Sequence, residues 1–359
     1  MRPTPHALVV GATGIAGSAL AQHLVDDGWQ VTGLSRRQSV GIDGVEEVHA
    51  DLSSSDEAVA ALGGTEFTHV FITAWVRCAT EDENIAVNSA MVRNLLDAVR
   101  PAGTVQHVAL MTGLKHYLGP FDAYGAGEVR DTPFHEDEER LPYPNFYYAQ
   151  EDELWAAAER DGFTWSVHRA HTVIGTAVGN AMNMAQTLAV QAAISREHGR
   201  PFVFPGSQTQ WNGLTDMTDA GLLAEHMQWA STTEAAANNS YNIVNGDVFR
   251  WRWMWPRIAE LLGVEAEGFS ERPRPLEQQM VDAPAEWKAV SARHGLAVED
   301  VSALASWWHT DADLGRDMEC LTDMRRSRLA GFDGNRPTLD CFVRVFDELR
   351  QRNLIPVIS

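Results

Sequence analysis

One short stretch near the start of the sequence constrains the fold more than any other. Residues 8–17 read LVVGATGIAG, which is an apolar strand, a glycine turn and the first turn of a helix. Gly11 permits the tight turn, Gly14 lets the backbone approach a pyrophosphate, and Gly17 lets the helix pack closely on the strand. The N–H groups at the helix start then face the phosphates. A glycine turn without a ligand is the alternative, but the flanking strand and helix favour a dinucleotide-binding turn.

Strands and helices alternate through the first half of the chain. After the first strand we expect strands at 29–35, 47–52, 69–74, 107–112 and 165–169, and helices at 15–27, 55–62, 83–99 and 145–160. This alternation predicts the α/β class, with a doubly wound parallel sheet of the Rossmann type. In such a sheet the ligand binds at the carboxyl ends of the strands.

Beyond Gly175 the simple alternation fades. We expect helices at 181–197, 219–230 and 253–262, and the region from Arg272 onward is rich in proline, tryptophan and charge. These segments predict a smaller, mostly helical lobe that caps the sheet. The predicted division assigns residues 1–175 and 212–246 to an NADP-binding Rossmann domain, and residues 176–211 and 247–359 to a substrate-binding lobe.

Composition excludes several classes of partner. A net charge of −21 over 359 residues argues against nucleic acid and anionic membranes. No apolar run is long enough to span a bilayer, and the first residues lack the apolar core of a signal peptide. Cys78, Cys320 and Cys341 are scattered without metal-binding spacing, which fits a reduced compartment. We therefore expect a cytoplasmic protein with a small-molecule substrate and no metal. A homodimer is compatible with the sequence.

The end of the second expected strand indicates which dinucleotide binds. An acidic residue there would bind the ribose hydroxyl of NAD. This chain has Arg36 and Arg37 instead. Guanidinium groups match phosphate oxygens, so this pair predicts the extra phosphate of NADPH, with a solvated basic pair as the alternative. Asp51, at the end of the third expected strand, is placed to meet the adenine.

Lysine is rare in this chain. Only two of its 28 basic residues are lysines, Lys115 and Lys288. Lys115 follows the fifth expected strand, at the edge of the sheet where a ligand would bind. Tyr147 opens the helix that follows. Taken singly, Lys115 could be a solvated strand-end charge and Tyr147 a packed aromatic residue.

Five motifs together resemble a known family. They are GATGIAG at 11–17, TGLKHYLGPF at 112–121, NFYYAQED at 145–152, WSVHR at 165–169 and NGDVFRW at 245–251. The chain resembles the progesterone 5β-reductase and iridoid synthase-like enzymes, which are extended short-chain dehydrogenase/reductases, over nearly its whole length. Members of that family reduce the carbon–carbon double bond of an enone with NADPH.

The resemblance implies a catalytic pair. Most short-chain dehydrogenases place a lysine four residues after the catalytic tyrosine, but here Glu151 follows Tyr147 at that spacing. The resemblance implies that Lys115 replaces the missing lysine. Hydride addition to an enone pushes negative charge onto the carbonyl oxygen, which a tyrosine hydroxyl and an ammonium stabilise. The predicted cofactor-binding residues are Gly11, Thr13, Gly14, Ile15, Gly17, Ser35, Arg36, Arg37, Asp51, Leu52, Thr73, Ala74, Thr112 and Tyr147.

The chain departs from the family pattern at two places. The family has proline after the arginine matched by Arg169, where this chain has Ala170 and His171, and we expect this change to alter how the strand end meets the nicotinamide. The family's Trp-Trp-Phe stands here as Trp-Trp-His at 307–309, so that the polar His309 replaces a pocket phenylalanine. We expect Trp75, Phe121 and His309 to line the substrate site. The imidazole favours small enones or enals, or substrates with a remote polar group, over progesterone.

Two other functions remain open at this point. An extended short-chain dehydrogenase could reduce carbonyls or act on sugar nucleotides, but this chemistry predicts the Tyr-x-x-x-Lys pair that is absent. A non-catalytic NADP-sensing protein on the same fold predicts loss of the tyrosine and lysine, which are present.

Overall fold

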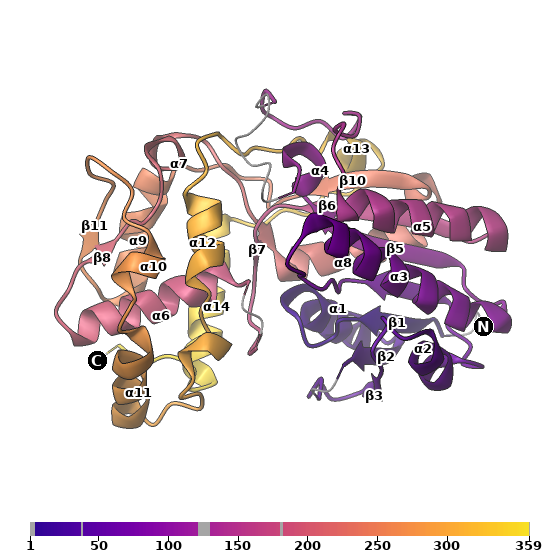
Figure 1. Cartoon of the computed structure of the whole chain (residues 1–359), viewed down its shortest axis with the longest axis horizontal. Helices are drawn as coiled ribbons and strands as arrows, with labels where there is room; N and C mark the ends of the chain where they lie inside the picture. The colour runs from indigo at the N-terminus through magenta and orange to yellow at the C-terminus, as the bar shows by residue number, and fades with distance from the viewer. Residues whose placement is uncertain (1–3, 37–38, 121–129, 180–181, 359) are drawn as a thin grey trace. The chain divides into compact units, whose positions relative to one another are not determined.

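The computed structural model describes residues 4–36, 39–120, 130–179 and 182–358 (Figure 1). The chain packs as two compact units. The first contains Met1–His171, Ala220–Ile243 and Thr322–Gly334, and the second contains Thr172–Asp219, Val244–Leu321 and Asn335–Ser359. This division differs most from the one proposed from the sequence at Thr322–Gly334, which packs with the first unit.

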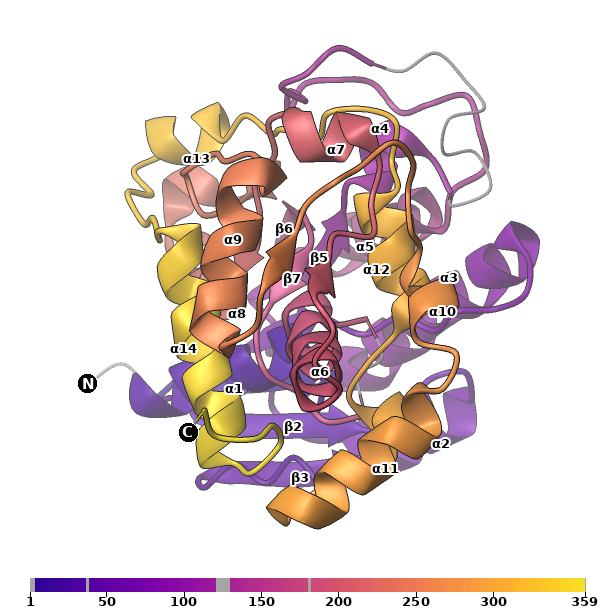
Figure 2. The same cartoon turned by 90° about the vertical axis from the view of Figure 1, so that its left-hand side faces the viewer.

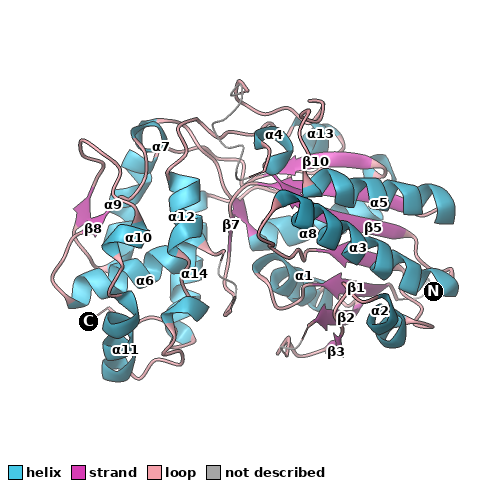
Figure 3. Ribbon diagram, viewed as in Figure 1, coloured by secondary structure: helices cyan, strands magenta, loops and turns pink. Residues whose placement is uncertain are grey.

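The first unit is built on a parallel sheet of seven strands, with helices on both faces (Figure 3). The strand order is β10-β6-β5-β4-β1-β2-β3, and every paired neighbour runs parallel. The predicted α/β class and doubly wound sheet are therefore confirmed. The strands are β1 (His6–Val10), β2 (Gln30–Ser35), β3 (Val45–His49), β4 (His69–Ile72), β5 (His107–Gly113), β6 (Thr164–Ala170) and β10 (Asn239–Ile243).

The direction of the chain across the sheet reverses beside β1. From β1 the chain adds β2 and β3 on one side, and then crosses to place β4 on the other side. The residues that follow β1 and β4 therefore meet at the switch point of the sheet, where ligands of doubly wound proteins bind.

Alternate side chains of the strands build the core on one face. Leu8 and Val10 of β1 point to the same side as Val108 and Leu110 of β5. They pack with Leu95 and other apolar residues of α2, α3 and α5. The opposite face is covered by α1 and α8, which pack on each other. The helices of this unit are α1 (Ile15–Asp26), α2 (Ser55–Leu62), α3 (Glu81–Val99), α4 (Lys115–Leu118), α5 (Phe146–Asp161), α8 (Ala220–Thr232) and α13 (Arg325–Leu329).

The second unit is mostly helical and is organised around one helix, α6 (Met184–Glu197). Every residue of α6 from Met184 to Ser195 is buried. Around it pack α9 (Trp251–Leu262), α11 (Ala283–His294), α12 (Trp307–Leu314) and α14 (Thr338–Gln351), as Figure 2 shows. Two short parallel pairs, β7 (Val173–Ile174) with β9 (Thr218–Asp219) and β8 (Phe202–Val203) with β11 (Ala266–Glu267), complete it, with α7 (Gln208–Asn212) and α10 (Leu276–Gln279).

No helix within the described ranges has both the length and the apolar character needed to cross a membrane.

The helix after the glycine turn approaches β1 more closely than any side chain would allow. A Cβ added at Gly17 would lie 2.1 Å from the carbonyl oxygen of Gly11, which is a backbone atom that cannot rotate away. Helix propensity favours alanine over glycine at such a position by about 1 kcal/mol. Packing therefore predicts that Gly17→Ala lowers the stability of the protein, whereas helix propensity predicts that it raises it.

We expect Gly17→Ala to destabilise the protein by about 1–3 kcal/mol, because the clash forces α1 away from β1. Denaturant unfolding measures the change. Ser18→Ala is the matched control, since it raises helix propensity on the same helix at a half-buried position and should be nearly neutral. A stabilised Gly17→Ala variant would show that propensity dominates and that the close approach is unimportant.

Candidate active site

The glycine turn joins the ends of β1 and β4. Gly11 has a φ of +86°, and its N–H donates to the carbonyl of Leu34 (2.9 Å). A Cβ at Gly11 would lie 2.9 Å from the Cβ of Ala74 and 3.1 Å from Oγ1 of Thr73, so these residues are in contact. The Thr73 hydroxyl donates to the carbonyl of Val10 (2.7 Å), which fixes the end of β4 against β1. The structure thus brings the predicted turn, Thr73 and Ala74 together.

The start of α1 has the properties of an anion site. Gly14 is the N-cap of α1 and supplies no side-chain cap, and the described first turn contains no acidic residue. Thr13 is half-buried beside it, and Ile15 is buried as the first helical residue. The N–H groups of this turn are therefore suited to phosphate oxygens.

The other predicted cofactor residues follow the ends of neighbouring strands. Arg36 is exposed directly after β2, whereas Arg37 lies outside the described residues. Ser35 is buried, and its hydroxyl lies 3.1 Å from Nδ1 of His49. Asp51 accepts hydrogen bonds from the N–H (2.9 Å) and hydroxyl (2.7 Å) of Ser53, and the neighbouring Leu52 is buried.

Thr112, near the end of β5, carries a buried hydroxyl that has no hydrogen-bond partner in the structure. Buried polar groups without a partner are rare in native proteins, and they often mark a site that a ligand completes. The orphaned hydroxyl and the glycine cradle fit a dinucleotide.

Lys115 and Tyr147 lie together, although they come from different elements. Lys115 begins α4 directly after β5 and its side chain is buried. Its ammonium lies 5.5 Å from the centroid of the Tyr147 ring, 4.9 Å from that of Phe146 and 4.5 Å from that of Trp75. The rings of Trp75 and Phe146 are stacked, with centroids 5.0 Å apart. Three aromatic residues thus form a seat for the ammonium, which we call the aromatic seat.

The Tyr147 hydroxyl lies beside the end of β5. A Cβ at Gly113 would lie 3.4 Å from the Tyr147 hydroxyl oxygen, so this glycine leaves room for the phenol. Burial raises the pKa of Tyr147, and the negative charge of Glu81 raises it further. The phenol therefore stays protonated at neutral pH and can act as a hydrogen-bond or proton donor.

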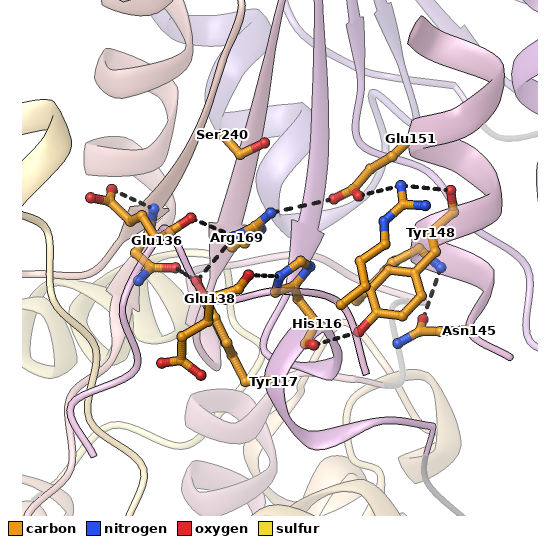
Figure 4. A network of polar contacts seen from close by, with 12 residues as sticks. His116, Tyr117, Glu136, Glu138, Asn145, Tyr148, Glu151, Arg169 and Ser240 are labelled. Atoms are coloured by element: carbon orange, nitrogen blue, oxygen red, sulfur yellow. Dashed lines mark hydrogen bonds and ion pairs between the residues drawn. The ribbon is translucent and has the colours of Figure 1, made fainter. Parts of the chain in front are cut away.

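The hydroxyl of the neighbouring Tyr148 is directed at the backbone of His116 (Figure 4). This hydroxyl donates to the carbonyl of His116 (2.6 Å) and accepts from the N–H of Leu141 (3.0 Å). Burial is the main cause that lowers the pKa of His116 to about 3, so the imidazole is neutral at pH 7 and packs against the rings of Tyr117 and Tyr148. Tyr148 and His116 are thus parts of the packed structure.

Glu151 occupies the position where a lysine would stand in most short-chain dehydrogenases, and its carboxylate is engaged by two arginines. It is fully buried and pairs with Arg140 (2.8 Å) and with Arg169 of β6 (3.9 Å). Figure 4 shows the contact with Arg169. Burial raises the pKa of Glu151, and Arg169 opposes that shift. The carboxylate therefore binds one cation from the loop before α5 and one from β6.

Arg169 continues this network to the far edge of the sheet. It donates to the hydroxyl of Tyr117 (3.2 Å) and to the backbone carbonyl of Glu136 (3.3 Å). Tyr117 in turn donates to Asn242 of β10 (2.7 Å). The Glu136 carboxylate accepts from the backbone N–H of Asn242 (3.0 Å) and of Arg326 (2.7 Å), so it joins the loop before α5 to β10 and α13.

The predicted substrate residues are placed less completely. Trp75 is half-buried in the aromatic seat. Phe121 lies outside the described residues. His309 is half-buried on α12 in the second unit, with its ring centroid 5.6 Å from that of Trp308. Ala170, at the position where the family pattern has proline, is buried at the end of β6.

Glu81, Asn145 and Phe146 lie near Lys115 and Tyr147 and were not predicted as parts of the site. Phe146 supplies one wall of the aromatic seat, and its backbone N–H donates to Glu81 (2.7 Å). Asn145 caps α5 and also reaches Lys115. The asparagine before a helix signals a cap in the sequence, but its second bond depends on the fold.

Among the residues that the structure describes, no group of three or more histidine, cysteine, aspartate or glutamate side chains could hold a metal ion.

The sequence matches the family of PRISE-like Rossmann-fold domains over residues 7–356. Among curated proteins it is similar to a (S)-8-oxocitronellyl enol synthase of Camptotheca acuminata, at 38% identity over 98% of this chain and 93% of the relative. It is also similar to the 3-oxo-Delta(4,5)-steroid 5-beta-reductase of Arabidopsis thaliana, at 35% identity over 98% of this chain and 93% of the relative.

Solved structures share the fold at much lower identity. The UDP-glucose 4-epimerase of Thermotoga maritima, solved with UDP-glucose, aligns with a TM-score of 0.69 and 13% identity over 96% of this chain and 99% of that chain. The Bordetella bronchiseptica enzyme WbmH, solved with NAD+, aligns with a TM-score of 0.64 and 12% identity over 98% of this chain and 99% of that chain.

The buried Glu136 predicts a pH dependence of stability. Burial raises the pKa of this carboxyl from 4.5 to about 7, so the folded state favours the protonated form. This contribution to stability is complete below about pH 4.5 and is lost as pH rises through about 7. We expect the free energy of unfolding to fall by up to roughly 1 kcal/mol per pH unit across that window from this group.

Urea unfolding of the natural protein and of Glu136→Gln between pH 5 and 7.5 measures this contribution. The variant should be less stable, because the amide accepts one of the two backbone bonds, but its stability should depend less on pH. All other titrating groups are common to both proteins, so equal slopes would contradict the assignment.

Proposed function

Because the chain belongs to the PRISE-like Rossmann-fold family, we propose that it reduces the carbon–carbon double bond of an enone or enal with NADPH. The chain is an oxidoreductase of the short-chain dehydrogenase/reductase superfamily, and the resemblance inferred from its motifs is confirmed. The observation that carries the proposal is the seating of Lys115 beside Tyr147 at the carboxyl end of β5. In this arrangement the lysine comes from a strand end rather than from the helix of the tyrosine.

The two residues support charge stabilisation at the substrate oxygen. Hydride addition to the β-carbon leaves an enolate, whose oxygen needs a donor. The Tyr147 phenol stays protonated through burial and can donate a hydrogen bond or its proton. The ammonium of Lys115, held in the aromatic seat, favours negative charge on either oxygen. When bound, NADPH would supply the hydride.

The glycine turn, Thr73, Ala74, Thr112 and the N-terminus of α1 would hold the dinucleotide. Arg36 and Arg37 would bind the phosphate that distinguishes NADPH from NADH. The exposed position of Arg36 at the end of β2 supports this assignment.

Trp75, Phe121 and His309 would line the substrate site. The polar His309 in place of a phenylalanine favours substrates that are smaller, or that carry a polar group remote from the carbonyl, over a wholly apolar steroid.

Carbonyl or sugar-nucleotide chemistry is the second candidate. The structural neighbours with UDP-sugar ligands are below 25% identical and share only the fold. The residue four positions after Tyr147 is Glu151, so no cation stands where this chemistry needs a lysine. The Glu151 carboxylate pairs instead with Arg140 and Arg169. A non-catalytic NADP-sensing protein is disfavoured because the tyrosine and lysine are both present and adjacent.

We predict a preference for NADPH that depends on the arginine pair. Charge-assisted bonds to a phosphate contribute about 1.5–3 kcal/mol each, so replacing Arg36 and Arg37 by alanine should raise the KM for NADPH about tenfold or more. The KM for NADH should stay nearly unchanged, which makes NADH the internal control. Equal use of both cofactors by the natural protein would contradict the prediction.

The catalytic assignment is tested by NADPH oxidation with cyclohexenone, a Δ4-3-ketosteroid, an α,β-unsaturated aldehyde and a saturated ketone. The enones and the enal should be reduced, and the ketone should not. A positioned proton donor contributes about 10²–10⁴-fold, so Tyr147→Phe and Lys115→Met should lose turnover in that range with little change in NADPH binding.

Tyr148→Phe is the matched control, because it removes a hydroxyl from the adjacent tyrosine that bonds to the His116 backbone. It should lose less than about tenfold, below the range for a positioned donor. Near-normal turnover of Tyr147→Phe on every active enone would refute the assignment. Reduction of the saturated ketone alone would favour the carbonyl reductase.

A further inference from the structure

We infer that Asn145 is a positioning residue, whose single side chain fixes Lys115 relative to Tyr147. The inference rests on the function proposed above and assigns a role to a residue outside the catalytic pair.

The carboxamide of Asn145 bonds to the backbone of both residues. Its Oδ1 accepts from the N–H of Tyr147 (3.0 Å), and its Nδ2 donates to the carbonyl of Lys115 (2.7 Å). The side chain is buried, with 3% of its surface exposed. Since an N–H can only donate and a carbonyl can only accept, the orientation of the amide is fixed by its partners.

The two helices that these bonds join explain why Asn145 is needed. Lys115 lies in α4, a helix of a single turn, which cannot fix its own position. Tyr147 lies in the first turn of α5, whose cap is Asn145. Tyr148 also bonds to α4, but at the carbonyl of His116. The carboxamide of Asn145 therefore connects the backbones of Lys115 and Tyr147 directly.

Placement matters because the lysine side chain is long. The aromatic seat holds the ammonium from the side, 4.5–5.5 Å from three ring centroids, while the backbone of Lys115 sets how far the chain extends. A displacement of about 1 Å in a catalytic group can lower the rate about 100-fold. Asparagine is also the cap that allows both bonds, since it combines an acceptor and a donor in one group.

Two variants separate the bond to Lys115 from the helix cap. Asn145→Asp keeps the acceptor for the Tyr147 N–H and loses the donor. Asn145→Ser keeps a capping hydroxyl that is too short to reach the Lys115 carbonyl and adds no charge. Both should lower kcat about 10- to 100-fold and leave the KM for NADPH unchanged. A fall in Asn145→Asp alone would assign the effect to the new charge and overturn the inference.

Thr104→Val is the control for loss of a comparable bond. Thr104 precedes the amino end of β5, and its hydroxyl donates to the carbonyl of Phe67 (2.8 Å). This variant should lose stability without a change in kcat. A similar fall in kcat for Thr104→Val would show that general destabilisation explains the Asn145 variants.

A double-mutant cycle with Lys115→Met decides whether Asn145 acts through the lysine. If it does, Asn145→Ser should change kcat by less than about threefold in the Lys115→Met protein, because the group that it positions is gone. Losses that multiply would overturn the inference. If Asn145→Ser keeps a normal kcat while Lys115→Met is impaired, the inference about Asn145 is overturned and the catalytic assignment stands. If Lys115→Met keeps a normal kcat, the catalytic assignment itself is overturned.

Discussion

The reversal of strand order beside β1 is the constraint on which the first unit depends. It is a property of the connections rather than of any one side chain, and it brings the ends of β1 and β4 side by side. The glycine turn can then touch Thr73 and Ala74, and Trp75 follows within reach of Lys115. The glycine turn and the aromatic seat therefore form at the same carboxyl ends of the strands, although their residues are distant in the sequence.

Lys115 follows β5 and does not lie on α5, so the position four residues after Tyr147 on α5 can hold a residue with another role. Glu151, which is fully buried, pairs with Arg140 and Arg169 and so fastens α5 to β6. A buried carboxylate of this kind would be costly without both cations. Glu151 at this position therefore has two effects. It rules out the Tyr-x-x-x-Lys arrangement, and it anchors the helix that carries Tyr147.

Local patterns in the sequence predicted what local physics determines. The apolar strands, the glycine turn and the helix that begins after Asn145 follow from hydrophobic periodicity and capping. The strand β10 was missed because Asn239, Ser240 and Asn242 make it read as a polar loop, although their neighbours bury it at the sheet edge. The second bond of Asn145, the aromatic seat and the partners of Glu136 depend on contacts between distant segments, which periodicity cannot reveal.

The return of residues 322–334 to the first unit has a consequence for how the chain folds during synthesis. The backbone N–H of Asp323 donates to the carbonyl of Phe134 (3.0 Å). The backbone carbonyl of Asp323 accepts from the side-chain amide of Asn242 (2.9 Å). The loop around Phe134 and the edge strand β10 therefore lack these partners until residue 323 has left the ribosome. In a nascent chain that ends before this segment, β10 can pair with β6 but lacks its contact with Asp323, so the first unit is completed only after most of the second has been synthesised.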